Sequence, residues 1–255
     1  MGNEASIKKN IIYSEKYVFE PLGDTPNLCG DERAYWEEWK SRVPKLAAEY
    51  PDKLYMNGST VKKTVCLTFD DAPDIKYTSG ILDVLKKYKV KASFFIVGMR
   101  VEKLPGLTRR IHEEGHLILN HTWQHYDLTT ISPEVLSEEI VSTEEKIYEV
   151  TGKRPALMRP PYGAVDKTVV GLTDRLGYRV VLWSVNTFDW LEKTKDNIVK
   201  NVLDNVRPGD IFLLHSYENK RPTLEALPII IEELRARGYE FENLAEILDI
   251  EPYKI

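Results

Sequence analysis

From residue 64 to the end of the chain, short apolar runs of strand length alternate with longer amphipathic stretches of helical periodicity. This alternation is typical of strand–helix repeats, in which each helix carries the chain back so that successive strands pair in parallel. Several helical stretches end at a glycine, where a left-handed backbone commonly terminates a helix. The apolar runs are 64–69, 91–97, 116–120, 156–159, 179–185, 210–215 and 239–243. The pattern predicts about seven parallel strands covered by helices, either as an open sheet or closed into a barrel.

The first 60 residues lack this alternation. Residues 31–50 have the character of a helix that carries Trp36 and Trp39 on one face. For these two rings, packing onto the body of the protein is favoured over a platform for substrate. A chain of 255 residues with 42% apolar residues suits one large α/β unit. We expect an irregular and helical N-terminal extension over residues 1–60, packed on a main domain over residues 61–255.

Charge, hydropathy and cysteine content exclude several classes of protein. The 35 Lys and Arg and 40 Asp and Glu residues are scattered, so no basic block could neutralise a run of phosphates, and we expect no nucleic acid partner. We expect no signal peptide, and no apolar stretch approaches the roughly 20 residues of a membrane helix. Cys29 and Cys66 offer neither a disulfide framework nor a CxxC zinc motif. Gly2 and Ser6 formally match a myristoylation pattern, although a start that replaces a removed export signal fits at least as well.

Polar side chains follow the predicted strands at their carboxyl ends. Active sites of parallel strand–helix folds are built at this edge, because the strand ends converge there and the loops are free to carry chemistry. Any one of these residues could be an isolated cap or turn residue, but their common edge favours one site. They are Asp70 and Asp71 after the first strand, His121 after the third, Arg159 after the fourth, Asn186 and Asp189 after the fifth, and His215 after the sixth.

The adjacent carboxylates of Asp70 and Asp71 call for a nearby cation, because like charges held close together raise each other's pKa. His121 and His125 could supply two imidazole ligands if the chain curls after His121, since residues four apart in a straight strand lie about 13 Å apart. Two imidazoles and one carboxylate can bind a divalent ion and leave a position open for water. An isolated HxxxH pattern is more often a pair of surface histidines than a metal site. Non-haem iron oxygenases also use two His and one carboxylate and remain a minor alternative.

Five motifs, in order and spacing, resemble those of the polysaccharide deacetylases of carbohydrate esterase family 4. They are TFDD at 68–71, HTWQH at 121–125, RPPYG at 159–163, NTFDW at 186–190 and LLH at 213–215. The resemblance implies a distorted (β/α) barrel with fewer regular strands than the common barrel, and a catalytic domain over residues 61–255. It also implies a hydrolase that removes acetyl groups from N-acetylated sugars of peptidoglycan, chitin or a related polymer. Such substrates imply a secreted or cell-envelope setting, with the polysaccharide as partner and no obligate protein partner.

Position by position, the resemblance implies that Asp71, His121 and His125 hold one divalent transition metal, usually zinc or cobalt. Asp70 is then the general base that takes a proton from the attacking water. The backbone N–H of Tyr162 would share the oxyanion with the metal, because preorganised donors stabilise a tetrahedral intermediate more than a planar substrate.

The resemblance assigns the remaining roles to residues on the same edge. His215 would protonate the departing amine, and Asp189 would keep its pKa high enough for that task. Arg159 resembles the arginine that orients the catalytic aspartate, for which a planar bidentate donor is suited. Without the resemblance, Arg159 would be interpreted as a solvated residue before a Pro-Pro turn. The positions that match substrate-contacting residues are Trp190 and Leu213, in the apolar slot for the acetyl methyl group, and Pro160 and Tyr162.

Two positions depart from the family pattern. Ala72 stands where glycine is usual, which would be costly if that position needs a positive φ. Asn186 stands where an acid often opens the fourth motif, so hydrogen bonding is retained without charge. A catalytically silent glycan-binding module of the same fold is the alternative to an enzyme. It ranks lower, because every residue assigned to the chemistry is present.

Overall fold

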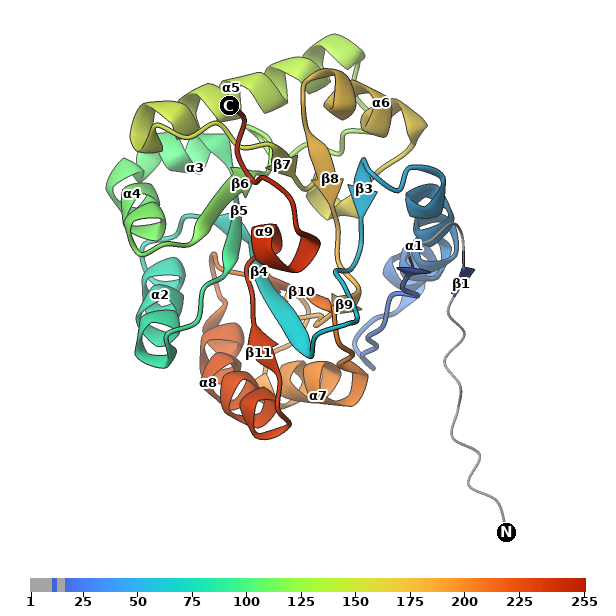
Figure 1. Cartoon of the computed structure of the whole chain (residues 1–255), viewed down its shortest axis with the longest axis vertical. Helices are drawn as coiled ribbons and strands as arrows, with labels where there is room; N and C mark the ends of the chain where they lie inside the picture. Colours follow the sequence, from blue (N-terminus) through green and yellow to red (C-terminus); the bar gives the residue numbers. More distant parts are fainter. Residues whose placement is uncertain (1–10, 13–16) are drawn as a thin grey trace.

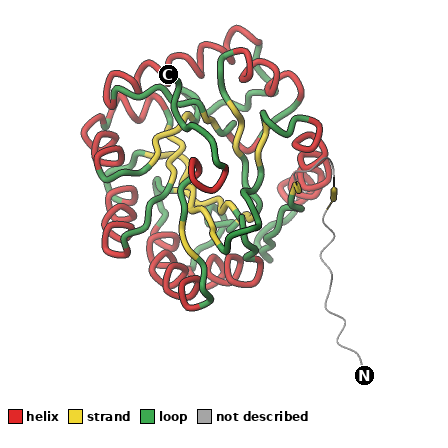
Figure 2. Tube along the Cα trace, viewed as in Figure 1, coloured by secondary structure: helices red, strands yellow, loops and turns green. Residues whose placement is uncertain are grey.

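The structure is a computed structural model and describes residues 11–12 and 17–255. The possible myristoylation pattern through Gly2 and Ser6 lies outside the described residues. Strands occupy the centre and helices surround them (Figures 1 and 2). The helices are α1 (Gly30–Glu49), α2 (Tyr77–Tyr88), α3 (Gly98–Lys103), α4 (Pro105–Glu113), α5 (Pro133–Thr151), α6 (Lys167–Arg175), α7 (Lys195–Asn205), α8 (Arg221–Ala236) and α9 (Leu244–Leu248), with a 3₁₀ turn η1 (Pro161–Gly163).

The main sheet is parallel and follows the path β3-β8-β7-β6-β5-β4-β10-β9, with β11 paired to β4 off this path. A short antiparallel pair, β1 and β2, lies apart from it. In chain order the strands are β1 (Ile11–Ile12), β2 (Tyr17–Val18), β3 (Leu54–Tyr55), β4 (Thr64–Ala72), β5 (Ser93–Ile96), β6 (Leu117–Asn120), β7 (Leu157–Met158), β8 (Arg179–Val181), β9 (Val185–Asn186), β10 (Ile211–His215) and β11 (Glu240–Phe241). The predicted distorted (β/α) barrel is confirmed, with eight strands along the path rather than about seven.

The apolar run 179–185, predicted as one strand, forms two. β8 lies near one end of the sheet path and β9 lies at the other end, so residues 182–184 cross between them. The backbone N–H of Leu182 donates to Tyr55 O on β3, whereas that of Ser184 donates to Ile211 O on β10. The curl of the sheet brings its two ends close enough for three residues to connect them.

The N-terminal segment contributes both a strand and a helix to the body of the protein. β3 pairs with β8 in the main sheet, although its two residues are too short to show any alternation in the sequence. Trp36 and Trp39 of α1 are buried, as predicted, and Trp39 stacks on Trp183 with ring centroids 4.8 Å apart. The domain boundary near residue 60 stays a prediction, but α1 and β3 share one hydrophobic cluster with the barrel.

Strand β4 is buried on both faces, which explains why its sequence is a continuous apolar run rather than an alternating one. Val65, Leu67 and Phe69 enter a hydrophobic cluster with residues of α2 and α8. Cys66 enters the other cluster, which contains the tryptophans of α1. Because side chains alternate along a strand, Asp70 continues the row of Cys66 and faces the same side. No helix in the described part of the chain is long and apolar enough to cross a membrane.

Candidate active site

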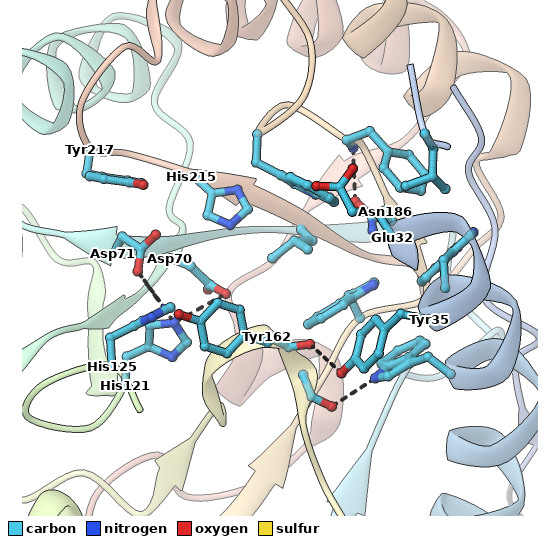
Figure 3. Close-up of a pocket in the computed structure, with 18 of the residues that line it drawn as sticks. Glu32, Tyr35, Asp70, Asp71, His121, His125, Tyr162, Asn186, His215 and Tyr217 are labelled. Atoms are coloured by element: carbon cyan, nitrogen blue, oxygen red, sulfur yellow. Dashed lines mark hydrogen bonds and ion pairs between the residues drawn. The ribbon is translucent and has the colours of Figure 1, made fainter. Parts of the chain in front are cut away.

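The two central strands end in the residues on which the site is built. Parallel pairing of β4 with β10 sets Leu213 opposite Thr68 and His215 opposite Asp70. Since every second side chain of a strand shares a face, Asp70 and His215 point to the same side. Figure 3 shows both side chains directed into one cavity. The cavity has a volume of about 650 Å³ and is lined by all three candidate metal ligands as well.

The candidate metal ligands converge because the backbone bends sharply at or next to each of them. Asp71 has a φ of 66°, which breaks the alternation of β4 and turns its side chain toward the cavity. Beyond β6, Thr122 and His125 also have positive φ values, 66° and 65°, so the chain curls after His121. The sequence required such a curl for His121 and His125 to meet. One ligand atom from each of Asp71, His121 and His125 lies within 4.8 Å of the others.

The spacing and chemistry of this group fit a shared divalent ion. Nε2 of His125 lies 3.1 Å and Nε2 of His121 lies 3.7 Å from Oδ1 of Asp71. Two atoms bound to one ion in tetrahedral geometry lie about 3.3 Å apart. Nδ1 of His121 donates to Arg159 O at 2.7 Å, which leaves Nε2 with its lone pair toward the cavity. Imidazole nitrogens with a carboxylate oxygen suit zinc or cobalt better than magnesium or calcium.

Burial and neighbouring groups keep these ligands in the protonation states that a metal requires. Burial lowers the pKa of His121 to about 4, so its imidazole is neutral near pH 7. Burial alone would raise the pKa of the Asp71 carboxyl, but the hydrogen bond with His125 and the nearby charges of His121, His125 and His215 together outweigh burial and hold this pKa well below its ordinary value. A neutral imidazole and an ionised carboxylate are both ready to donate electron pairs.

Arg159 is fully buried and fixes Asp70. Its Nη1 donates to Oδ1 of Asp70 and to Thr68 Oγ1, both at 2.8 Å. The other guanidinium nitrogens donate to the carbonyl oxygens of Val181 and Leu182. The contact with Asp70 is therefore made through one nitrogen and is not the bidentate pair expected from the sequence. The guanidinium of Arg159 thereby connects Asp70 to the segment of the chain that crosses from β8 to β9.

Asp189 orients the imidazole of His215 and fixes a proton on one of its two ring nitrogens. Nδ1 of His215 donates to Oδ1 of Asp189 at 2.7 Å. Oδ2 of Asp189 accepts from the His215 backbone N–H and from Thr223 Oγ1. Burial alone would lower the pKa of His215, but the charge of Asp189 and its hydrogen bond outweigh burial and raise this pKa above its usual value. Thr223, on α8, was not found from the sequence.

The loop that carries Tyr162 is a 3₁₀ turn with an unusual backbone. Tyr162 has a φ of 60° and ψ of 4°, and its N–H makes no hydrogen bond within the described residues. Two side chains of α1 hold the turn from the other side: Tyr35 Oη donates to Tyr162 O at 3.2 Å, and Trp39 Nε1 donates to Gly163 O at 2.8 Å. A Cβ at Gly163 would lie 2.5 Å from the Trp183 ring, so only glycine fits beneath the turn.

Comparison with known proteins agrees with this geometry. The family model described as polysaccharide deacetylase matches residues 57–181. A peptidoglycan-N-acetylglucosamine deacetylase of Bacillus cereus is 36% identical over 91% of this chain and 83% of its own length. The chain belongs to the polysaccharide deacetylase family.

Two further relatives of this polysaccharide deacetylase are informative. The peptidoglycan-N-acetylmuramic acid deacetylase PdaA of Bacillus subtilis is 39% identical over 77% of this chain and 75% of its own length. The solved structure of the Bc1960 peptidoglycan N-acetylglucosamine deacetylase superposes with a TM-score of 0.79 at 34% identity, and covers 82% of this chain and 98% of that one. The names of the two curated relatives differ in the sugar, so similarity alone leaves the sugar open.

The positions matched to substrate contacts differ in their access to the cavity of this polysaccharide deacetylase. Trp190, 39% exposed, and Leu213, 4% exposed, both line it. Tyr162 also lines it and is 60% exposed. Pro160 does not line the cavity: it is buried beneath the turn, where its carbonyl accepts from Gly163 N–H. Direct contact between Pro160 and substrate is therefore not supported.

The two departures from the family pattern have simple local explanations. The positive φ that follows the first motif belongs to Asp71, and Ala72 is not among the residues with positive φ. Alanine at this position is therefore not strained, contrary to the concern raised by the sequence. Asn186 lines the cavity, and its Oδ1 accepts from Phe188 N–H at 2.9 Å, so the amide stabilises the loop after β9.

One wall and one rim of the cavity were not predicted from the sequence. The wall comes from α1 and from Leu28, two residues before it, and the rim comes from α3 and the loop after β10. The wall residues are Leu28, Asp31, Glu32, Tyr35, Trp36 and Trp39, and the rim residues are Arg100 and Tyr217. The tryptophan pair was the available signal for the wall, and it was correctly assigned to packing without its lining role. Figure 3 shows Glu32 and Tyr35 on one side of Asp70 and His215, and Tyr217 on the other.

Proposed function

We propose that this chain is a metal-dependent hydrolase that removes N-acetyl groups from N-acetylated sugars of peptidoglycan and releases acetate. The observation that carries the proposal is the pairing of Asp70 with His215 across adjacent strands, beside Asp71, His121 and His125 in one cavity. This arrangement provides a base, an acid and a metal-binding group around one point. The relatives named as peptidoglycan deacetylases support peptidoglycan over chitin as the polymer.

The metal would be held by Asp71, His121 and His125, and zinc or cobalt suits this donor set. When bound, the ion supplies Lewis acidity: it lowers the pKa of a water and polarises the acetyl carbonyl. The hydrogen bond from His121 Nδ1 to Arg159 O keeps the imidazole in the ligating tautomer.

Asp70 acts as the general base. Oδ2 of Asp70 lies 3.8 Å from Nε2 of His121, so this carboxylate borders the metal group without being the closest acid to it. Oδ1 is committed to Arg159, which orients the carboxylate and leaves Oδ2 to accept the proton of the attacking water.

The backbone N–H of Tyr162 stabilises the oxyanion that develops on the acetyl group. This N–H has no partner among the described residues and lies on a turn held by Tyr35 and Trp39, so it is preorganised and needs no rearrangement as negative charge forms. The methyl group of the acetyl would lie against Leu213 and Trp190.

His215 acts as the general acid. An amine leaves poorly unless its nitrogen is protonated, and the raised pKa of His215 favours the protonated imidazole that can supply this proton. Because Nδ1 is bonded to Asp189, Nε2 is the nitrogen that delivers this proton.

The chain would work in a secreted or cell-envelope setting, where its polymer is found. We assign the catalytic domain to residues 61–255 and the extension to residues 1–60, with α1 of the extension forming one wall of the site.

The test is acetate release from peptidoglycan glycan strands. Dialysed protein with added zinc or cobalt should release acetate, chelation should abolish release, and adding the metal back should restore it. Metal analysis of active, dialysed protein should give one ion per chain, reduced in Asp71→Asn. Active protein without a transition metal would show the mechanism to be wrong, and metal bound without acetate release would favour a silent glycan-binding module.

A further inference from the structure

The cavity carries opposite charges at its two ends. Arg100, on α3, is the one Lys or Arg side chain among the described residues that line it. Asp31 and Glu32, at the start of α1, line the opposite wall. Figure 3 shows Glu32 across the catalytic centre from Tyr217, and Tyr217 is the ring on which Arg100 is stacked.

Arg100 lies at the rim beside the candidate metal ligands, and only part of its hydrogen-bonding capacity is used within the described residues. Its Nη1 donates to the backbone oxygen of Asp71 at 2.7 Å, and its guanidinium carbon lies 4.3 Å from the centre of the Tyr217 ring. Within the described residues its guanidinium forms no ion pair and no second hydrogen bond. A guanidinium has five N–H donors in a fixed plane. Arg100 therefore presents unpaired donors to the cavity, in contrast to Arg159, whose three nitrogens are all bonded.

We infer that Arg100 binds a carboxylate of the glycan substrate, so that the site prefers sugars with an acidic substituent over neutral ones; this rests on the proposed function. In peptidoglycan the lactyl ether of N-acetylmuramic acid provides such a carboxylate next to the sugar ring, and stem-peptide carboxylates lie further out. A planar, partly desolvated guanidinium is suited to bind a carboxylate through two parallel hydrogen bonds.

The acidic residues on the opposite wall determine at which end of the cavity the carboxylate binds. Asp31 and Glu32 would repel a carboxylate placed at their end of the cavity, so the acidic substituent lies at the end of Arg100. The unsubstituted or amino-bearing neighbour would lie along α1. The charge pattern thus fixes the orientation of an alternating glycan in the groove.

The experiment compares one acidic substrate with two neutral ones. They are an alternating glycan of N-acetylglucosamine and N-acetylmuramic acid with free lactyl carboxylates, the same glycan with these carboxylates converted to methylamides, and a neutral N-acetylglucosamine oligomer. The quantity measured is the ratio of kcat/KM for the free-acid glycan to that for its methylamide. A parallel glycan with the stem peptide attached distinguishes a lactyl from a peptide carboxylate.

The wild-type protein should favour the free acid, and Arg100→Gln should lower the ratio about 10-fold, mainly through KM, because a hydrogen bond to a charged group is lost. Arg100→Lys should retain part of the preference. The control is Arg235→Gln, which removes a guanidinium that also bonds one carbonyl and lies over one ring, outside the cavity. It should leave the ratio unchanged.

Two results would overturn the inference. One is a wild-type ratio near one. The other is an equal loss on all three substrates in Arg100→Gln together with weaker zinc binding, which would mean that Arg100 only holds the backbone of Asp71. If no substrate releases acetate, the proposed function fails. Calorimetric binding of the free-acid and methylamide glycans to wild type and Arg100→Gln then decides the carboxylate site by itself.

Discussion

The cavity has two sides that are built from different kinds of sequence. The strand-end side consists of Asp70, Asp71, His121 and His215, each at the end of a strand or within two residues of it. The α1 side consists of aromatic and acidic residues from a helix that precedes the first long strand. The first side carries the groups for the reaction, and the second side shapes the space and holds the turn that carries Tyr162.

The two sides also differ in how far their positions can be predicted from the sequence. Strand ends in a parallel sheet converge whatever the details of packing, so the positions of Asp70, His121 and His215 follow from the repeat alone. The position of α1 depends on stacking between Trp39 and Trp183, which are 144 residues apart in the sequence. No local pattern encodes a contact of that range. The same holds for Arg100, whose role depends on the bend at Asp71 and on Tyr217.

The fold shows the same division. The repeat predicted parallel strands covered by helices, and the hypothesis of a shared metal required a curl after His121; both features are present. The repeat missed β3, because two residues show no alternation, and it merged β8 with β9, because the chain stays apolar while it crosses the closed end of the curl. Apolar composition indicates burial but not a change of strand.

The largest effects are expected on the strand-end side. Asp70→Asn should keep the fold and the metal but reduce turnover about 10²–10⁴-fold, because an amide cannot accept the proton of the attacking water. Asp71→Asn should lose metal affinity as well as turnover. Zinc titration by calorimetry into both variants, alongside acetate release, distinguishes the two roles. Equal loss of zinc binding would mean that the roles are shared or exchanged.

The next effect concerns His215 and its partner. As pH rises through the raised pKa of His215, the acid loses its proton and the rate should fall, giving the alkaline limb of a bell-shaped profile. Asp189→Asn removes the charge that raises this pKa, so the limb should move to lower pH. His215→Ala should lose most amide hydrolysis but less hydrolysis of an activated acetate ester, whose leaving group needs little protonation. Equal losses on amide and ester would exclude the acid role.

A smaller effect is expected from the α1 side, with a matched pair of variants. Trp39→Phe removes the hydrogen bond to Gly163 O, whereas Trp36→Phe shortens a neighbouring buried ring whose Nε1 has no partner among the described residues. Both variants lose ring volume, so the difference between them measures the effect of the hydrogen bond to Gly163 O. Trp39→Phe should be less stable than Trp36→Phe by about 1 kcal/mol in urea unfolding. It should also show a several-fold lower kcat, with zinc affinity unchanged.

Equal stability and equal kcat in the two tryptophan variants would break the comparison between the two sides. It would mean that the turn carrying Tyr162 keeps its shape without α1, and that the helix contributes only packing. A loss of zinc affinity in Trp39→Phe would instead mean that the two sides are coupled through the core.

The smallest effect is expected from Tyr35→Phe, which removes one partly solvated hydrogen bond to Tyr162 O. Burial raises the pKa of Tyr35 to about 12, so its hydroxyl keeps its proton and remains a donor over the working pH range. The variant should therefore lower kcat/KM on glycans by about threefold at most, by the same factor at every pH, since the net value of such a bond is about 0.5–1.5 kcal/mol and exposure reduces it. A small acetate ester needs no groove, so the same small loss on the ester would assign it to the oxyanion turn, and a loss restricted to glycans would assign it to contact with the polymer. A pH-dependent loss would contradict both, because the Tyr35 hydroxyl keeps its proton over that range.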